Sequence, residues 1–117
     1  MSRAPTLRFV FKIGFPTEKE LESYVEFWKE ISALIQQEEG ARGTRLHRVV
    51  GERAVLAIAE WDSYEARARA YQRIAEKYPP GHKIYWQAER FGGSMIFQEF
   101  VKEVAVVWPP ASSRRRI

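Results

Sequence analysis

The sequence predicts an α+β fold in which strands and helices follow the order βαββαβ. Three observations carry this prediction: four runs that suit strands, two stretches with apolar residues every three or four positions, and turn residues between them. With 117 residues, 45% of them hydrophobic and 29% charged, the chain has the size and composition of one globular domain. We expect residues 1–110 to form this domain and residues 111–117 to form a mobile basic tail.

The first strand and the first helix are marked by a change of periodicity. Residues 7–15 alternate between apolar and other side chains, as a strand with one buried face does. Pro16 stops this strand, and Thr17 followed by Glu20 forms a capping box that begins a helix. Apolar residues then recur every three or four positions, and Gly40 is expected to end the helix.

A hairpin and a second helix come next. Residues 44–50 and 53–61 suit two strands, and Gly51 lies in the two-residue turn between them. The second of these strands is apolar on both faces, which predicts a central position in the sheet. Asp62 and Glu65 form a capping signature, so a helix should begin directly after this strand.

The second helix and the last strand complete the pattern. The apolar stripe of the helix is expected to comprise Tyr64, Ala68, Tyr71, Ile74, Ala75 and Tyr78. Arg67, Arg69 and Arg73 should then point toward solvent. Prolines and a glycine at residues 79–81 break the helix, residues 82–90 can form short helical turns, and residues 94–108 return to a strand.

This order is that of the ferredoxin-like split βαβ fold, which places both helices on one face of a four-stranded antiparallel sheet. The other face of the sheet then needs a cover. Because the central strand is apolar on both sides and the first strand carries Phe9 and Phe11, we predict that two copies pack sheet against sheet in a homodimer.

Composition narrows the function classes. Without cysteine, the chain has no disulfide, thiolate nucleophile or Cys-ligated metal. Its net charge of +4 falls to +1 without Arg114, Arg115 and Arg116, which disfavours nucleic acid as a partner of the folded face. The absence of asparagine is typical of proteins from hot environments.

Since no run approaches the roughly 18 apolar residues of a membrane span, and no signal-peptide core is present, we expect a cytoplasmic protein without a membrane partner.

Two segments carry a family resemblance. The run Gly-Ala-Arg-Gly-Thr-Arg-Leu-His-Arg at residues 40–48 and the strand-to-helix junction at residues 57–66, which contains Trp-Asp-Ser, resemble the antibiotic biosynthesis monooxygenase family. The resemblance covers roughly residues 7–78. It implies a dimeric α/β barrel, and the family includes cofactor-free oxygenases of polycyclic phenols, haem-degrading enzymes, quinol oxidases and members without a known activity.

The resemblance also implies a site. A tryptophan at the end of the third strand and a tyrosine in the second helix are typical of the cofactor-free members, and Trp61 and Tyr71 match these positions. His47, with Arg45 on the same strand face, is a candidate general base because an imidazole accepts a proton near neutral pH. The candidate catalytic residues are Trp61, Tyr71 and His47. The candidate substrate-binding residues are Tyr24, Trp28 and Tyr64, which would form apolar walls of a pocket between the sheet and the helices, and Arg45, which would be a polar contact.

The predicted function is cofactor-independent oxygenation, by an oxidoreductase, of a small aromatic or quinone-like molecule. The alternative is a non-enzymatic module that binds a metabolite or a partner. Aromatic residues at these positions also serve as core residues, and His47 also suits a surface or an interface.

Other chemistries have less support. Haem degradation is disfavoured because the chain has neither the asparagine nor the second-helix histidine of that branch, although haem binding through His47 or His82 stays open. These two histidines lack a ligand spacing, so neither a metal nor a cofactor is predicted. A base-stacking face of the RNA-recognition type would need aromatics on the third strand, which has none before Trp61.

Overall fold

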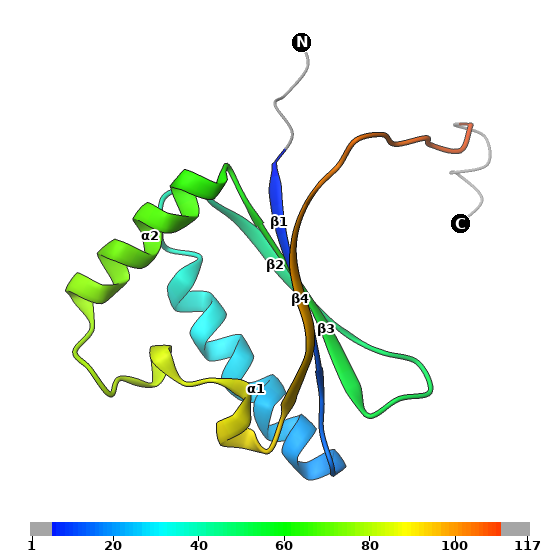
Figure 1. Ribbon diagram of the computed structural model, residues 1–117, viewed down its shortest axis with the longest axis vertical. Helices are drawn as coiled ribbons and strands as arrows, with labels where there is room; N and C mark the ends of the chain where they lie inside the picture. The colour runs from blue at the N-terminus through cyan, green and yellow to red at the C-terminus, as the bar shows by residue number, and fades with distance from the viewer. Residues whose placement is uncertain (1–5, 111–117) are drawn as a thin grey trace.

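A computed structural model describes residues 6–110 and has the predicted order of elements. Helices α1 (Glu18–Ile35) and α2 (Tyr64–Lys77) lie on one face of a four-stranded antiparallel sheet, seen nearly edge-on in Figure 1. The strands are β1 (Leu7–Gly14), β2 (Ala41–Arg48), β3 (Ala54–Trp61) and β4 (Ser94–Lys102), in the order β2-β3-β1-β4. The predicted α+β, ferredoxin-like fold is confirmed, including the central position of β3.

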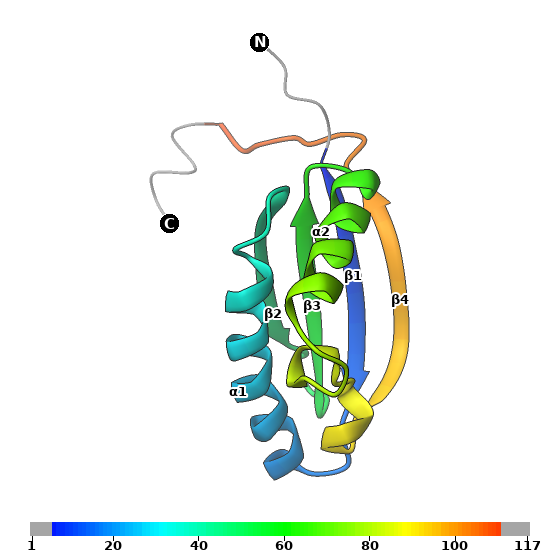
Figure 2. The same ribbon diagram turned by 90° about the vertical axis from the view of Figure 1, so that its left-hand side faces the viewer.

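The strand register separates a helix face from an open face. Phe9 pairs with Ala59 of β3 and with Phe100 of β4, and alternate residues of the central strands join them on the helix face. On the open face, Val10 of β1 pairs with Ile58 of β3. Phe9 and Phe11 face the helices and line the cavity described below, so their predicted place between the two sheets of a dimer is wrong. Figure 2 shows α1 in front of β2 and α2 in front of β3 and β1, whereas neither helix covers β4.

The core lies between the helices and the central strands. Ile13 and Val55, which pair across β1 and β3, pack in one cluster with Leu21 and Tyr24 of α1. A second cluster consists of Leu7, Trp61 and Ala70, with Ile35, Ala41 and Ala59 against it. The first cluster anchors α1 and the second anchors α2.

The first predicted helix cap is confirmed. The Glu20 amide donates to the Thr17 hydroxyl at 3.1 Å, and this hydroxyl donates to the Glu20 carboxylate at 2.9 Å. The predicted cap of α2 is wrong by one residue, because Ser63 accepts from the Ala66 amide at 3.0 Å. The Asp62 amide instead donates to the Gly40 carbonyl, which holds the chain extended for one more residue, and its carboxylate binds Arg42.

The predicted stripe of α2 is partly wrong. Its buried residues are Ala66, Ala70 and Ile74, while Ala68 and Ala75 are exposed. Small residues at four-residue spacing let the helix approach the sheet closely, so the packed face is set by alanines rather than by tyrosines. Arg67 consequently does not point into open solvent, as described below.

Element ends differ from the predictions in several further places. Strand β2 spans Ala41–Arg48 rather than residues 44–50, so residues 49–53, and not Gly51 and Glu52 alone, connect it to β3. Helix α1 ends at Ile35, and Gly40 instead precedes β2, with a φ of 95° and an added Cβ only 2.9 Å from that of Ala66. Two short 3₁₀ helices, η1 (Lys83–Tyr85) and η2 (Ala88–Phe91), confirm the predicted turns before β4. Strand β4 ends at Lys102, earlier than predicted, and the predicted tail at 111–117 lies outside the described residues.

Candidate ligand-binding cavity

A cavity of about 370 Å³ lies on the helix face of the sheet, between α1, α2 and the segment that contains η1 and η2. Its walls are mainly aromatic and aliphatic. The aromatic residues that line it are Phe9, Phe11, Tyr24, Phe27, Trp28, Trp61, Tyr71 and Trp86. Cavities of this size and composition are typical of small-molecule sites.

Trp61 and Tyr71 meet at the α2 end of the cavity. Trp61 is the last residue of β3 and is 1% exposed, so its ring is fixed by packing. Its ring centroid lies 6.1 Å from that of Tyr71 on α2, and Tyr71 keeps 40% of its surface exposed. A buried indole therefore supports a more accessible phenol.

Arg67 adds a charge beside these rings. Its guanidinium carbon lies 4.6 Å from the ring centroid of Tyr71, 4.8 Å from that of Phe9 and 5.1 Å from that of Phe100. These distances are within the range of cation–π interactions. Among residues 6–110, Arg67 is the one charged side chain that lines the cavity.

The opposite end of the cavity is formed by α1 and the 3₁₀ helices. Phe27 stacks on Trp86 with ring centroids 5.9 Å apart, and Tyr24 lies 6.0 Å from Phe91. Burial, together with the charge of Glu89, raises the pKa of Tyr24 to about 12. The Tyr24 phenol therefore stays protonated at neutral pH and can serve as a donor but not as a base.

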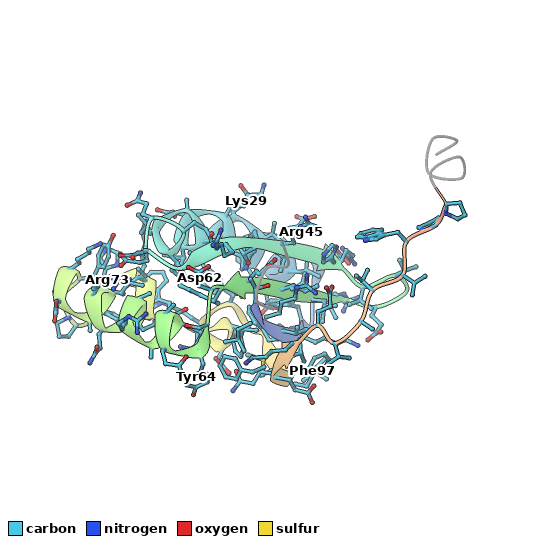
Figure 3. The ribbon with its side chains drawn as sticks, turned by 90° about the horizontal axis from the view of Figure 1, so that it is seen from above. Lys29, Arg45, Asp62, Tyr64, Arg73 and Phe97 are labelled. Atoms are coloured by element: carbon cyan, nitrogen blue, oxygen red, sulfur yellow. The ribbon has the colours of Figure 1, made fainter. Side chains whose placement is uncertain are left out.

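The structure brings together four of the seven candidate site residues. Tyr24, Trp28, Trp61 and Tyr71 all line the cavity. Tyr64 does not: it is 55% exposed and contacts the Phe100 ring at 5.0 Å, beside β4 and away from α1 (Figure 3).

Arg45 and His47 lie elsewhere. They pair with Ile58 and Leu56 on the open face of the sheet, whereas Leu46 between them packs against the core. Both are exposed, and Figure 3 shows Arg45 on β2, at the sheet edge opposite to Phe97 on β4. The sheet therefore separates this histidine and this arginine from the cavity.

Sequence reasoning missed several polar residues of the cavity. Besides Arg67, these are Ser32, Gln36, Thr44, Gln87 and Gln98. Arg67 could have been found, because it precedes Tyr71 by four residues and such residues share one side of a helix. Gln98 carries a weaker signal, since only the register with Phe11 shows that it faces the helices.

Within residues 6–110, no three or more His, Asp or Glu side chains are grouped so that they could hold a metal ion. None of the helices in this part of the chain has the length and hydropathy needed to cross a membrane. The His82 ring lies 4.6 Å from that of Tyr78, and its Nδ1 accepts a hydrogen bond from the Ile84 amide.

Comparison with known proteins gives structural neighbours but no family. The sequence matches no family model and no curated protein. A dimeric ferredoxin-like protein from an uncultured marine organism is 14% identical, with a TM-score of 0.65 over 89% of this chain and 100% of that one. A second dimeric ferredoxin-like protein of marine origin is 15% identical, with a TM-score of 0.60 over 90% of this chain and 91% of that one.

A third neighbour has a described activity. SnoaB from Streptomyces nogalater, a cofactor-independent oxygenase, is 23% identical, with a TM-score of 0.57 over 92% of this chain and 99% of that one. At these sequence identities, the likeness to the three neighbours shows a shared fold and nothing more specific.

Proposed function

We propose that the chain binds a small aromatic or quinone-like molecule in the cavity and acts on it as a cofactor-independent monooxygenase. The observation that carries this proposal is the aromatic lining of the cavity around Trp61 and Tyr71. Flat aromatic ligands gain affinity from burial against such rings. The resemblance of residues 40–48 and 57–66, and the fold shared with a cofactor-independent oxygenase, support the same conclusion.

The chemistry needs no group beyond the substrate and dioxygen. A bound phenol or anthrone loses a proton, and the resulting anion is electron-rich enough to reduce O₂. A new carbon–oxygen bond gives a hydroperoxide, which loses water and leaves a carbonyl. In an anthrone, one CH₂ and one O₂ become one C=O and one H₂O; in a phenol, the hydrogens of one ring C–H and of the O–H leave as water, and the product is a quinone. The protein has to bind and orient the substrate and to favour its anion.

A second function is favoured by a different observation. Neither a carboxylate nor an imidazole of the described residues lines the cavity, so a conventional general base is lacking there. This arrangement would serve a non-enzymatic module that binds an aromatic metabolite. The two functions differ in oxygen consumption and not in binding.

Oxygen uptake with anthrone as the substrate tests the choice. We expect uptake above the uncatalysed rate, and we expect both Trp61→Phe and Tyr71→Phe to lower it at least about tenfold. Tyr78→Phe is the matched control, because Tyr78 does not line the cavity and should keep wild-type turnover. Saturable binding of anthrone without oxygen uptake would instead support the non-enzymatic function.

We further propose that the active form is a homodimer in which the open faces of two sheets pack together. Val10, Leu56 and Ile58 lie in the centre of this face, and Phe97 and Val101 of β4 lie at its margin. Phe97 is 39% exposed and Val101 is 38% exposed in the single chain. The apolar residues of this face lie among charged ones such as Arg8, Lys12 and Arg45. Burial of the apolar residues favours a cover, and the two marine neighbours with the same fold are dimeric.

The dimer predicts a specific sensitivity to charge. Phe97→Glu should shift the molar mass measured by light scattering toward that of a monomer, since the dimer would have to bury two added carboxylates, and Lys12, the nearest basic side chain in the register, already binds Glu52. Val50→Glu introduces the same charge at a residue that is 96% exposed in the β2–β3 turn, and it should leave the mass unchanged. A wild-type protein that is monomeric at micromolar concentration would contradict the proposal.

A further inference from the structure

We propose that the ligand of the cavity carries an anionic oxygen, a carboxylate or a phenolate, and that Arg67 binds it. This inference rests on the proposed function in that it takes the cavity as the site of an aromatic ligand. It adds the charge of that ligand and the residue that recognises it.

The first observation is an unsatisfied donor. The Nε–H of Arg67 is buried and has no hydrogen-bond partner, and it is the one such buried side-chain atom within residues 6–110. Leaving a buried donor unpaired costs about 1–3 kcal/mol, so such groups call for an explanation. The Arg67 side chain also lines the cavity, so a ligand oxygen there could accept hydrogen bonds from this guanidinium.

The second observation is the lack of a counter-ion. Arg42, Arg48 and Arg73 each bind a carboxylate, on Asp62, Glu18 and Glu38 respectively. For Arg67, the structure of residues 6–110 gives three aromatic rings instead. These rings stabilise the positive charge, but a ring face offers Nε–H no oxygen of the kind that a guanidinium binds best.

The third observation is the charge of the surrounding wall. No acidic side chain of the described residues lines the cavity, so a bound anion would meet one positive charge and no negative one. Charges interact more strongly in such an apolar surrounding than in water. The planar guanidinium can also donate two parallel hydrogen bonds to one carboxylate.

This assignment has a chemical consequence for the proposed reaction. A cation next to a bound phenol stabilises its deprotonated form and lowers its pKa. Arg67 would thus favour the electron-rich anion that reacts with dioxygen, in a cavity that offers neither an imidazole nor a carboxylate as a base. Its contribution is to bind and stabilise the anion, and the proton passes to solvent.

A pair of probes of nearly equal shape tests the charge. Binding of 2-naphthoate and of uncharged 2-naphthamide is measured by quenching of tryptophan fluorescence at neutral pH. We expect the wild-type protein to bind 2-naphthoate at least about tenfold more tightly, and Arg67→Gln to abolish this preference while 2-naphthamide binding stays unchanged. Arg67→Lys should keep part of the preference.

Arg69→Gln is the matched control. It removes the same charge from α2, but Arg69 is exposed and lies outside the cavity, so the preference should persist. Circular dichroism melting of each variant verifies folding, and Arg67→Lys provides the test if Arg67→Gln does not fold.

The outcomes separate the two proposals. If both probes bind equally well to the wild-type protein, or if Arg67→Gln leaves the preference intact, the role of Arg67 is overturned while the aromatic cavity stands. If neither naphthalene binds, the proposed function fails, and this inference fails with it.

Discussion

Trp61→Ala is expected to lower the free energy of unfolding by about 3–5 kcal/mol, the usual cost of removing a buried tryptophan from a core. Trp61 is 1% exposed and is the largest of the fully buried side chains. It joins Leu7 of β1 to Ala70 of α2, so its loss would leave a hole under the helix that carries Arg67 and Tyr71. Urea unfolding followed by circular dichroism measures the change.

Two further variants show whether the effect is one of packing. Trp61→Phe keeps an aromatic ring at the site and should recover a large part of the lost stability. Val50→Ala, at an exposed turn residue, should change the free energy of unfolding by less than about 0.5 kcal/mol. A Trp61→Ala protein within about 1 kcal/mol of the wild type would show that Trp61 is not the anchor of α2.

Glu38→Gln is expected to lower the free energy of unfolding by about 2–3 kcal/mol at pH 7. The Glu38 side chain is 3% exposed, and its carboxylate binds Arg73, at 2.9 Å from Nε, and Lys77. Each hydrogen bond to a charged group contributes about 1.5–3 kcal/mol. The two bonds of Glu38 contribute less than twice this amount, because the side chains of Arg73 and Lys77 stay partly hydrated. These contacts join the turn after α1 to the last two turns of α2.

The same carboxylate predicts a dependence on pH. Hydrogen bonds from Lys77 and Arg73 hold the pKa of Glu38 below its ordinary value of 4.5. A lowered pKa in the folded state stabilises the protein above the pKa of the unfolded state, and this contribution is lost as the pH falls through the folded value. The stability difference between wild type and Glu38→Gln should therefore be constant near neutral pH and shrink below about pH 4.5.

Urea unfolding of both proteins between pH 3 and pH 7 measures this difference. Glu39→Gln is the matched control, because Glu39 is exposed and contacts Arg73 through its backbone carbonyl, which the substitution leaves in place. A difference between wild type and Glu38→Gln that did not change with pH would show that the carboxylate charge is not what stabilises this junction.

The order of elements could be predicted because it depends on local chemistry. Alternation over residues 7–15 and the Thr17–Glu20 capping box are properties of neighbouring residues, and both describe the structure correctly apart from one residue at the strand end. The central position of β3 also followed from its composition, since a strand with two apolar faces is seldom an edge. The fold class was determined at this level.

The candidate site was predictable only in part. The rings of Trp61 and Tyr71 come close together because β3 leads directly into α2, and this local connection is visible in the sequence. Arg45 and His47 were placed on a common strand face, but which face of β2 looks toward the helices depends on its register with β3. A shift of one residue exchanges the two faces of a strand, so the sequence of β2 alone could not decide this.

The sequence by itself determined the βαββαβ order, the alternation of the first strand and the aromatic character of the site. Which face of the first strand looks toward the helices was decided by the tertiary structure, which turns Phe9 and Phe11 into the cavity. The rotation of α2 was decided by the tertiary structure, because Ala66 and Ala70 pack against the sheet more closely than tyrosines could. This rotation brings Arg67 to the cavity, next to rings from β1, α2 and β4. Contacts between distant segments therefore fixed the position of the one charge that lines the cavity in the described chain.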